Sequence, residues 1–193
     1  MKTLKLIELH IKGMVCDRCI STVKSELENL GASVIELKLG KAIIKYPKHK
    51  ITLQSIEDAL IKHNFELIID DDTKTIEAIK TVLVEIVSNL PVEMTTNLSA
   101  ILANKLQKDY TYLSKLFSNR LEITIEKYFI LLKIEKTKEL IQTGQLNFTQ
   151  ISYDLGYSSV NYLSNQFKQI TGMSMSAYKK LSDWNRKSLD KIL

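Results

Sequence analysis

The chain has 193 residues, enough for one large or two small domains. Apolar residues make up 45% of it and charged residues 25%, a balance that argues against a disordered chain. Six glycines and two prolines are too few for an all-β sandwich or a loop-rich fold. The formal net charge is +5, and all of it lies in residues 73–193, because residues 1–72 hold 11 basic and 11 acidic side chains. A polyanionic partner is therefore expected for the C-terminal part alone.

The first residues, MKTLKLIELHIKG, alternate between polar and apolar and lack the continuous apolar core of a signal peptide. No run approaches the ~18 apolar residues that a membrane-spanning helix needs. We therefore expect a cytoplasmic protein with no membrane partner. In that reducing compartment, a permanent disulfide between Cys16 and Cys19 is disfavoured.

Residues 1–70 mix the periodicities of strands and helices. Strands are predicted at residues 4–11, 34–39, 42–46 and 65–69, with a tight turn at Gly40 and Lys41. One helix ends before Gly31, and its inward face holds Cys19, Val23, Leu27 and Leu30. A second helix is predicted over residues 51–63, with Leu53, Ile56 and Leu60 pointing inward. The order βαββαβ predicts an α+β ferredoxin-like domain over residues 1–70.

The polar stretch DDDT, residues 70–73, predicts a short hinge that also caps the following helix, since carboxylates favour a helix N-terminus. From Thr73 onward the pattern predicts only helices. The first of them carries an apolar stripe of Ile76, Ile79, Leu83, Ile86 and Leu90. Residues 71–193 are therefore predicted to form a second, all-α domain.

An internal repeat runs through this second domain, because the sequence matches itself without a gap when it is shifted by 50 residues. Residues 97–101 (NLSAI) align with residues 147–151 (NFTQI), and YLS recurs at 112–114 and 162–164. Phe117 also aligns with Phe167, and Tyr128 with Tyr178. Such self-similarity indicates one structural unit used twice.

Each copy of the repeat predicts a helix, a short turn, a second helix and a closing helix. The turns fall at residues 107–109 and 156–158, and a long helix is predicted over 125–141 between the copies. A helix, a three- to four-residue turn and a second helix form a helix-turn-helix, whose second helix fits the major groove of DNA. Two copies would place two such helices in successive grooves of double-stranded DNA.

The stretch at residues 151–180, ISYDLGYSSVNYLSNQFKQITGMSMSAYKK, resembles the C-terminal signature of the AraC-type transcription regulators. The resemblance covers roughly residues 74–181, and it implies that the partner is double-stranded DNA. The chain departs from the family pattern at three positions, with Ser152 for Ala, Met175 for Pro and Glu122 for Gly. The matching residues are Gly156, Tyr157, Tyr162, Phe167, Lys168, Gly172 and Tyr178.

By position, this resemblance implies that the exposed face of each second helix reads DNA bases. The base-reading candidates are Tyr110, Thr111, Ser114 and Lys115 in the first copy and Val160, Asn161, Ser164 and Asn165 in the second. Asn can read adenine edges, and Thr or Val can contact a thymine methyl group. Arg120 and Lys168 are predicted to contact phosphates, which set register rather than sequence. Individual positions have the alternative interpretation of solvated surface, whereas the residues predicted for the core are Tyr112, Leu113, Phe117, Tyr162, Leu163 and Phe167.

Both cysteines of the chain lie in GMVCDRC, residues 13–19, where the first strand ends and the first helix begins. A helix N-terminus is expected to lower a thiol pKa and so to favour the thiolate, which is the form that binds metal. One chain cannot build an all-thiolate zinc site, because that takes four cysteines. Two soft thiolates at Cys16 and Cys19 suit Cu(I), with Ag(I), Hg(II) and Zn(II) as alternatives.

In this setting the motif resembles the heavy-metal-associated domain of copper chaperones and metal-pumping ATPases, over residues 3–70. The resemblance implies that Cys16 and Cys19 are the metal ligands, that Met14 turns inward and that Phe65 packs beside the site. Asn64 replaces the family's usual Gly and can adopt its left-handed backbone. His63 is the one histidine expected near the cysteines. Two other interpretations stay open for the motif, namely a thiol–disulfide redox pair and a protein interface that has lost its metal.

These patterns predict a DNA-binding transcription regulator that responds to a soft metal ion, with a metal-bridged homodimer as one arrangement. The alternative is a metal carrier or a thiol redox protein whose helical part docks a partner. No enzyme activity is expected, because we find no Gly-rich phosphate loop and no Ser-His-Asp set in the sequence.

Overall fold

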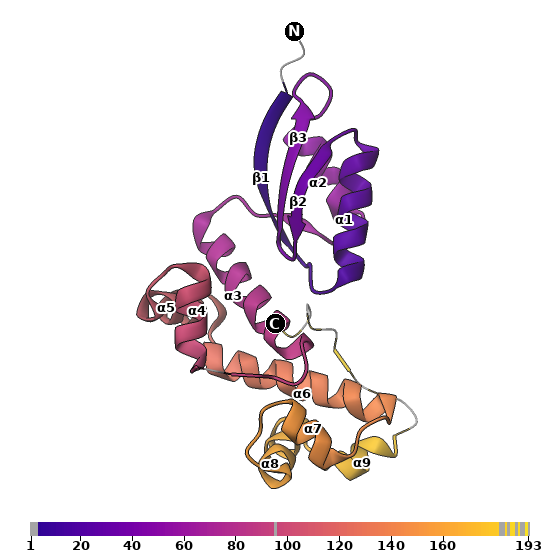
Figure 1. Cartoon of the computed structure of the whole chain (residues 1–193), viewed down its shortest axis with the longest axis vertical. Helices are drawn as coiled ribbons and strands as arrows, with labels where there is room; N and C mark the ends of the chain where they lie inside the picture. The colour runs from indigo at the N-terminus through magenta and orange to yellow at the C-terminus, as the bar shows by residue number, and fades with distance from the viewer. Residues whose placement is uncertain are drawn as a thin grey trace. The chain divides into compact units, whose positions relative to one another are not determined.

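The computed structural model describes residues 4–94 and 96–181, together with Trp184, Arg186, Lys187, Leu189 and Ile192. The chain divides into two compact units, Met1–Thr81 and Val82–Leu193. The division falls within helix α3, Asp71–Ser88 (Figure 1). The domain boundary predicted after residue 70 lies directly before this helix and stays a prediction.

The first unit has the predicted βαββαβ order, so the ferredoxin-like fold is confirmed. Its four strands form one antiparallel sheet in the order β2-β3-β1-β4. Alternate residues of the central strands, such as Leu9, Ile11 and Ile44, are buried in the core with Val23 and Leu27 of α1. The elements are β1 Leu4–Lys12, α1 Asp17–Asn29, β2 Ser33–Lys38, β3 Lys41–Pro47, α2 Leu53–Ile61 and β4 Glu66–Leu67.

Two details of this unit differ from the prediction. Leu53 is 47% exposed, whereas Ile56 and Leu60 are fully buried as predicted. Leu53 lies at the very start of α2, and Ile51, just before the helix, is buried in the core instead. The last strand, predicted over five residues, is only two residues long. Ile69, at the end of the predicted strand, lies beyond it and is 84% exposed.

The hinge before α3 acts as a helix cap, as predicted. The Asp70 carboxylate accepts a hydrogen bond of 2.8 Å from the backbone N–H of Thr73. Ile76, Ile79 and Leu83 of the predicted apolar stripe are buried. The helix is therefore fixed by a cap at its start and by an apolar face along its length.

Every secondary-structure element described in the second unit is a helix. The order of these helices is the predicted double helix-turn-helix. Its helix caps repeat with the same spacing as the sequence. Asn97, Asp109 and Thr124 cap α4, α5 and α6, and residues 50 positions later cap α7, α8 and α9. Each cap contributes about 1 kcal/mol by pairing a backbone N–H that the helix leaves free. The helices are α4 Leu98–Leu106, α5 Tyr110–Leu121, α6 Ile125–Thr143, α7 Phe148–Asp154, α8 Val160–Thr171 and α9 Met175–Lys179.

The core of each copy depends on the same pair of aromatic rings. Phe117 of α5 lies 5.6 Å from Tyr128 of α6, and Phe167 of α8 lies 5.5 Å from Tyr178 of α9, measured between ring centres. Both phenylalanines are fully buried, as are Leu113 and Leu163. The core prediction for these four residues is confirmed.

The core prediction is wrong for Tyr112 and Tyr162, whose side chains are 44% and 55% exposed. Successive residues of an α-helix are about 100° apart around its axis. Tyr112 and Tyr162 lie about 100° around the axis from buried Leu113 and Leu163, and α5 and α8 bury only a narrow face, so the two tyrosines fall outside it although they are aromatic and recur in both copies.

The three departures from the AraC pattern are accommodated locally. Ser152 is buried, and its hydroxyl donates to the carbonyl of Thr149 at 2.8 Å. Met175 is buried in the first turn of α9, which Ser174 caps. Glu122 has a φ of 57° at the end of α5, where its counterpart Gly172 has a φ of 80° at the end of α8.

This left-handed position predicts opposite effects of two substitutions. Gly172→Ala is expected to destabilise the protein by about 1 kcal/mol, because a side chain is disfavoured at positive φ even where space is open. Glu122→Gly is expected to be neutral or to stabilise by up to about 1 kcal/mol, since it removes that penalty. Urea denaturation of both variants against the unchanged chain tests the pair. A Glu122→Gly variant as unstable as Gly172→Ala would contradict this account.

Candidate metal site and nucleic-acid interface

The two cysteines lie side by side at the start of α1. Cys16 has extended backbone (φ −157°, ψ 169°) and occupies the position before the first helical residue. The two Sγ atoms are 3.4 Å apart, longer than the ~2.05 Å of a disulfide, so both thiols are free. Cys16 is exposed, and Cys19 is partly buried against the core of the first unit. Both sulfurs are therefore close enough to bind one ion, from the exposed side of the loop.

The backbone around the cysteines depends on two residues with positive φ. Gly13 has a φ of 92°, and a Cβ atom there would lie only 3.0 Å from the carbonyl oxygen of Asn64. Asn64 itself has a φ of 61°, which confirms that it adopts the left-handed backbone. Met14 is buried as predicted, and the Phe65 ring lies beside Gly13. The loop is thus supported from below by apolar side chains.

The thiol pKa differs from the prediction at Cys19. Burial raises the pKa of the Cys19 thiol, and a backbone hydrogen bond at Val15 opposes that rise only in part. The expected lowering by the helix N-terminus is wrong for this residue, because desolvation by burial outweighs the backbone hydrogen bonds at Val15 and Cys16. A soft metal can still displace the proton, since it binds the thiolate directly.

His63 is not a partner of the cysteines. Its Nε2 atom lies 3.3 Å from Oε1 of Glu26, in the second half of α1. Within the part of the chain that the structure describes, no three His, Cys, Asp or Glu side chains form a group that could hold a metal. Among these residues the candidate site therefore consists of two thiols.

The predicted DNA-reading residues lie on the first turns of α5 and α8. Thr111, Lys115, Asn161 and Asn165 are exposed, and Ser114 and Ser164 are half-buried beside them. Tyr110 and Val160 are half-buried as well, while Arg120 and Lys168 are exposed further along the two helices. For the eight base-reading candidates, exposure therefore follows the same pattern at positions 50 residues apart.

Tyr110 is already engaged within the protein. Its hydroxyl donates a short hydrogen bond to the carboxylate of Glu126 on α6. Burial and this carboxylate raise the pKa of Tyr110, and the same bond lowers the pKa of Glu126. The pair therefore ties the start of α5 to α6.

Sequence reasoning missed four exposed residues on these two helices. Asn119 and Gln169 are exposed four positions after Lys115 and Asn165, on the same side of each helix. Tyr112 and Tyr162 are exposed in the first turns. Helical spacing measured from the buried Leu113 and Leu163 would have indicated all four.

Helix α6 joins the two copies, and its 19 residues span roughly 28 Å at 1.5 Å per residue. Lys133 Nζ lies 3.9 Å from the centre of the Tyr157 ring, in the turn between α7 and α8. Burial lowers the pKa of Lys133 to about 8, while the ring favours its charged form. This contact orients α8 on α6.

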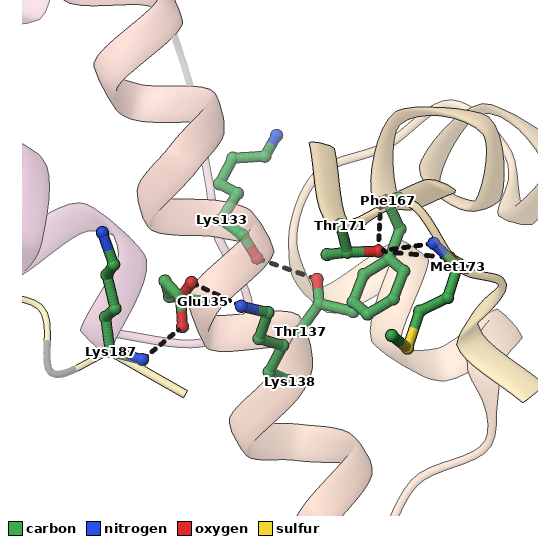
Figure 2. A network of polar contacts seen from close by, with 8 residues as sticks. All are labelled: Lys133, Glu135, Thr137, Lys138, Phe167, Thr171, Met173 and Lys187. Carbon is green, nitrogen blue, oxygen red and sulfur yellow. Dashed lines mark hydrogen bonds and ion pairs between the residues drawn. The ribbon is translucent and has the colours of Figure 1, made fainter. Parts of the chain in front are cut away.

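A chain of polar contacts follows the same helix (Figure 2). Thr137 donates from its hydroxyl to the carbonyl of Lys133 at 2.8 Å, and Lys138 pairs with Glu135 at 2.7 Å. The backbone N–H of Lys187 donates to Glu135 at 3.0 Å. Close to the end of α8, the Thr171 hydroxyl donates to the carbonyl of Phe167 at 2.7 Å.

Comparisons with known proteins agree with both halves of this structure. Residues 102–181 match the family described as a helix-turn-helix domain. Residues 102–181 thus match a helix-turn-helix domain of AraC type, and the N-terminal part of the chain is similar to a copper chaperone.

The individual relatives each match one part of the chain. The copper chaperone CopZ of Archaeoglobus fulgidus is 34% identical over 59 residues, which is 31% of this chain and 28% of that protein. The Msm operon regulatory protein of Streptococcus mutans is 28% identical over 79 residues, 41% of this chain and 28% of that protein. The chain therefore spans about a quarter of the length of these curated relatives. The C-terminal domain of AraT, a response regulator from Geobacillus stearothermophilus, covers 62% of this chain with 97% of its own, at 20% identity and a TM-score of 0.49.

No helix within the described residues is both long enough and apolar enough to cross a bilayer.

The unequal burial of the cysteines predicts unequal reactivity. In the metal-free reduced protein, Cys16 is expected to react with iodoacetamide faster than Cys19, because Cys19 is partly buried and its pKa is raised. Mass spectrometry of the single variants Cys16→Ser and Cys19→Ser, sampled over time, measures the two rates separately. Guanidinium-unfolded protein is the control, in which the two rates should converge. Faster labelling of Cys19 in the folded protein would contradict the burial described here.

Proposed function

We propose that this chain is a sequence-specific, DNA-binding transcription regulator of AraC type that responds to a soft metal ion. The observation that carries the proposal is the pair of capped second helices, α5 and α8, which expose equivalent positions. A helix-turn-helix places the N-terminal residues of its second helix against base edges in the major groove. Two of them on one chain read a two-part site.

On the DNA side, Thr111, Lys115, Asn161 and Asn165 are the base contacts that exposure supports best. Asn161 and Asn165 carry amides that suit adenine, and Lys115 suits guanine. Arg120 and Lys168 contact phosphates and set the register. Tyr110 and Ser114, with Val160 and Ser164, are half-buried and contribute at the edge of this surface.

On the metal side, Cys16 and Cys19 hold one soft ion as thiolates. Cu(I) is the ion that two sulfur ligands favour most, and Ag(I), Hg(II) and Zn(II) are alternatives. Similarity to a protein described as a copper chaperone supports this assignment. The free thiols also suit a reducing cytoplasm, where we place the protein.

Metal binding changes DNA affinity only if the two states of the protein bind DNA unequally. Helix α3 is the segment that carries the chain from the metal-binding unit into the DNA-binding unit, and Asp70 caps its first turn. We therefore assign coupling to α3. A homodimer bridged by metal through four thiolates is a second arrangement with the same ligands.

The DNA contacts predict specific losses of affinity. Asn161→Ala and Lys115→Ala are each expected to weaken binding to the specific site by about 1–3 kcal/mol, the worth of a good base contact. Fluorescence anisotropy on a duplex from upstream of the protein's own gene, at fixed salt, measures the change. Lys62→Ala, which removes an exposed lysine of the first unit, is the matched control. Equal affinities for all three variants and the unchanged chain would contradict the assigned surface.

The metal response has its own test. DNA affinity is measured with and without one equivalent of Cu(I), under anaerobic reducing conditions. A shift is expected in the unchanged chain and not in the Cys16→Ser, Cys19→Ser double variant, which should retain basal DNA binding. Tight DNA binding with no metal-dependent shift would leave a DNA-binding regulator and remove metal sensing from the proposal.

A further inference from the structure

Tyr112 and Tyr162 occupy equivalent places in the two copies. Each is the third residue of its helix, and each backbone N–H donates to the capping side chain, Asp109 or Ser159, at 3.2 Å. Their side chains are nevertheless 44% and 55% exposed. The cap fixes the backbone position of each tyrosine, and the exposed side chain extends outward from the first turn of the helix.

A neighbouring group lies against each ring. The Nζ atom of Lys108 lies 5.2 Å from the centre of the Tyr112 ring. The Tyr157 ring lies 5.9 Å from the Tyr162 ring and is tilted by 55°. Neither hydroxyl makes a hydrogen bond to another residue within the described part of the chain. Each tyrosine thus has a ring that contacts a neighbouring side chain and a hydroxyl that can donate a hydrogen bond to a partner.

Among the exposed positions at the start of α5 and α8, both copies share the tyrosine but differ one residue before it and three residues after it; the half-buried Ser114 and Ser164 are also shared. Thr111 corresponds to Asn161, and Lys115 corresponds to Asn165. Positions that differ between copies suit the reading of different bases. A side chain that is the same in both copies suits the part of DNA that is the same at every base pair, which is the phosphate backbone.

The positions of the tyrosines around the helix axis also favour a contact with the phosphate backbone. At about 100° per residue, Tyr112 lies roughly 60° around the helix axis from Lys115 and roughly 100° from Thr111. It therefore stands on the flank of the base-reading face rather than at its centre, and the same holds for Tyr162. When a second helix enters the major groove, its flanks approach the phosphates that border the groove.

We propose that Tyr112 and Tyr162 are paired phosphate contacts, each donating its hydroxyl to a backbone phosphate beside the groove that its helix enters. This inference rests on the proposed DNA-binding function and adds a positioning role to it. The two contacts set the depth and angle of α5 and α8 without choosing a base.

The test uses variants that remove only the hydroxyl, Tyr112→Phe and Tyr162→Phe, singly and together in the full chain. Each is expected to bind roughly 3–10-fold more weakly, both to the specific duplex and to a scrambled duplex of the same composition. The ratio of the two affinities and the salt dependence should stay unchanged, because a neutral phosphate contact carries neither base information nor charge. Tyr153→Phe is the matched control, since Tyr153 is 75% exposed on α7 and lies outside the second helix.

Three results would overturn the inference. Phe variants that bind both duplexes as tightly as the unchanged chain would show that the hydroxyls do not contact DNA. A loss confined to the specific duplex would assign the tyrosines to base reading instead. A loss of the same size in Tyr153→Phe would indicate a general effect on the domain. If the unchanged chain binds neither duplex, the proposed function fails as well, and this separates the two failures.

Discussion

The buried contact between a phenylalanine of each second helix and a tyrosine of the helix that follows it determines the exposed surface of both helix-turn-helix units. Phe117 packs on Tyr128, and Phe167 packs on Tyr178, at nearly the same distance. Because this contact fixes which side of α5 and α8 is buried, it also fixes which side remains exposed. The Tyr110–Glu126 hydrogen bond then holds the first helix-turn-helix copy to α6, and the Lys133–Tyr157 contact holds the second.

The shape of the loop that carries the two cysteines depends on backbone conformation more than on packing. Gly13 leaves room for the Asn64 carbonyl, and Asn64 accepts a left-handed backbone to present it. Exposed Cys16 and partly buried Cys19 then stand together over an apolar base that includes Met14. One half of the chain thus offers soft ligands at its surface, while the other offers polar and basic side chains.

Much of this could be predicted from the sequence, since both signals involved are local and periodic. The 50-residue repeat predicted the two helix-turn-helix units, and strand alternation with helical spacing predicted βαββαβ. The errors came where a tertiary environment decides the outcome. Tyr112 is exposed although aromatic, Leu53 is exposed at a helix end, and burial raises the pKa of Cys19 against the effect of the helix end. Residue type and spacing alone do not report how far a core extends.

The helix caps recur at equivalent positions in the two copies, which separates the residues that define the fold from those that are exposed. The residues that start each helix and the rings that bury it are shared between the two copies, so the information needed for folding is kept apart from the exposed positions. Thr111 and Lys115 in one copy differ from Asn161 and Asn165, which occupy the equivalent positions in the other. Exposed side chains can therefore differ between the two copies while the positions of the caps and the buried rings that define the fold stay the same.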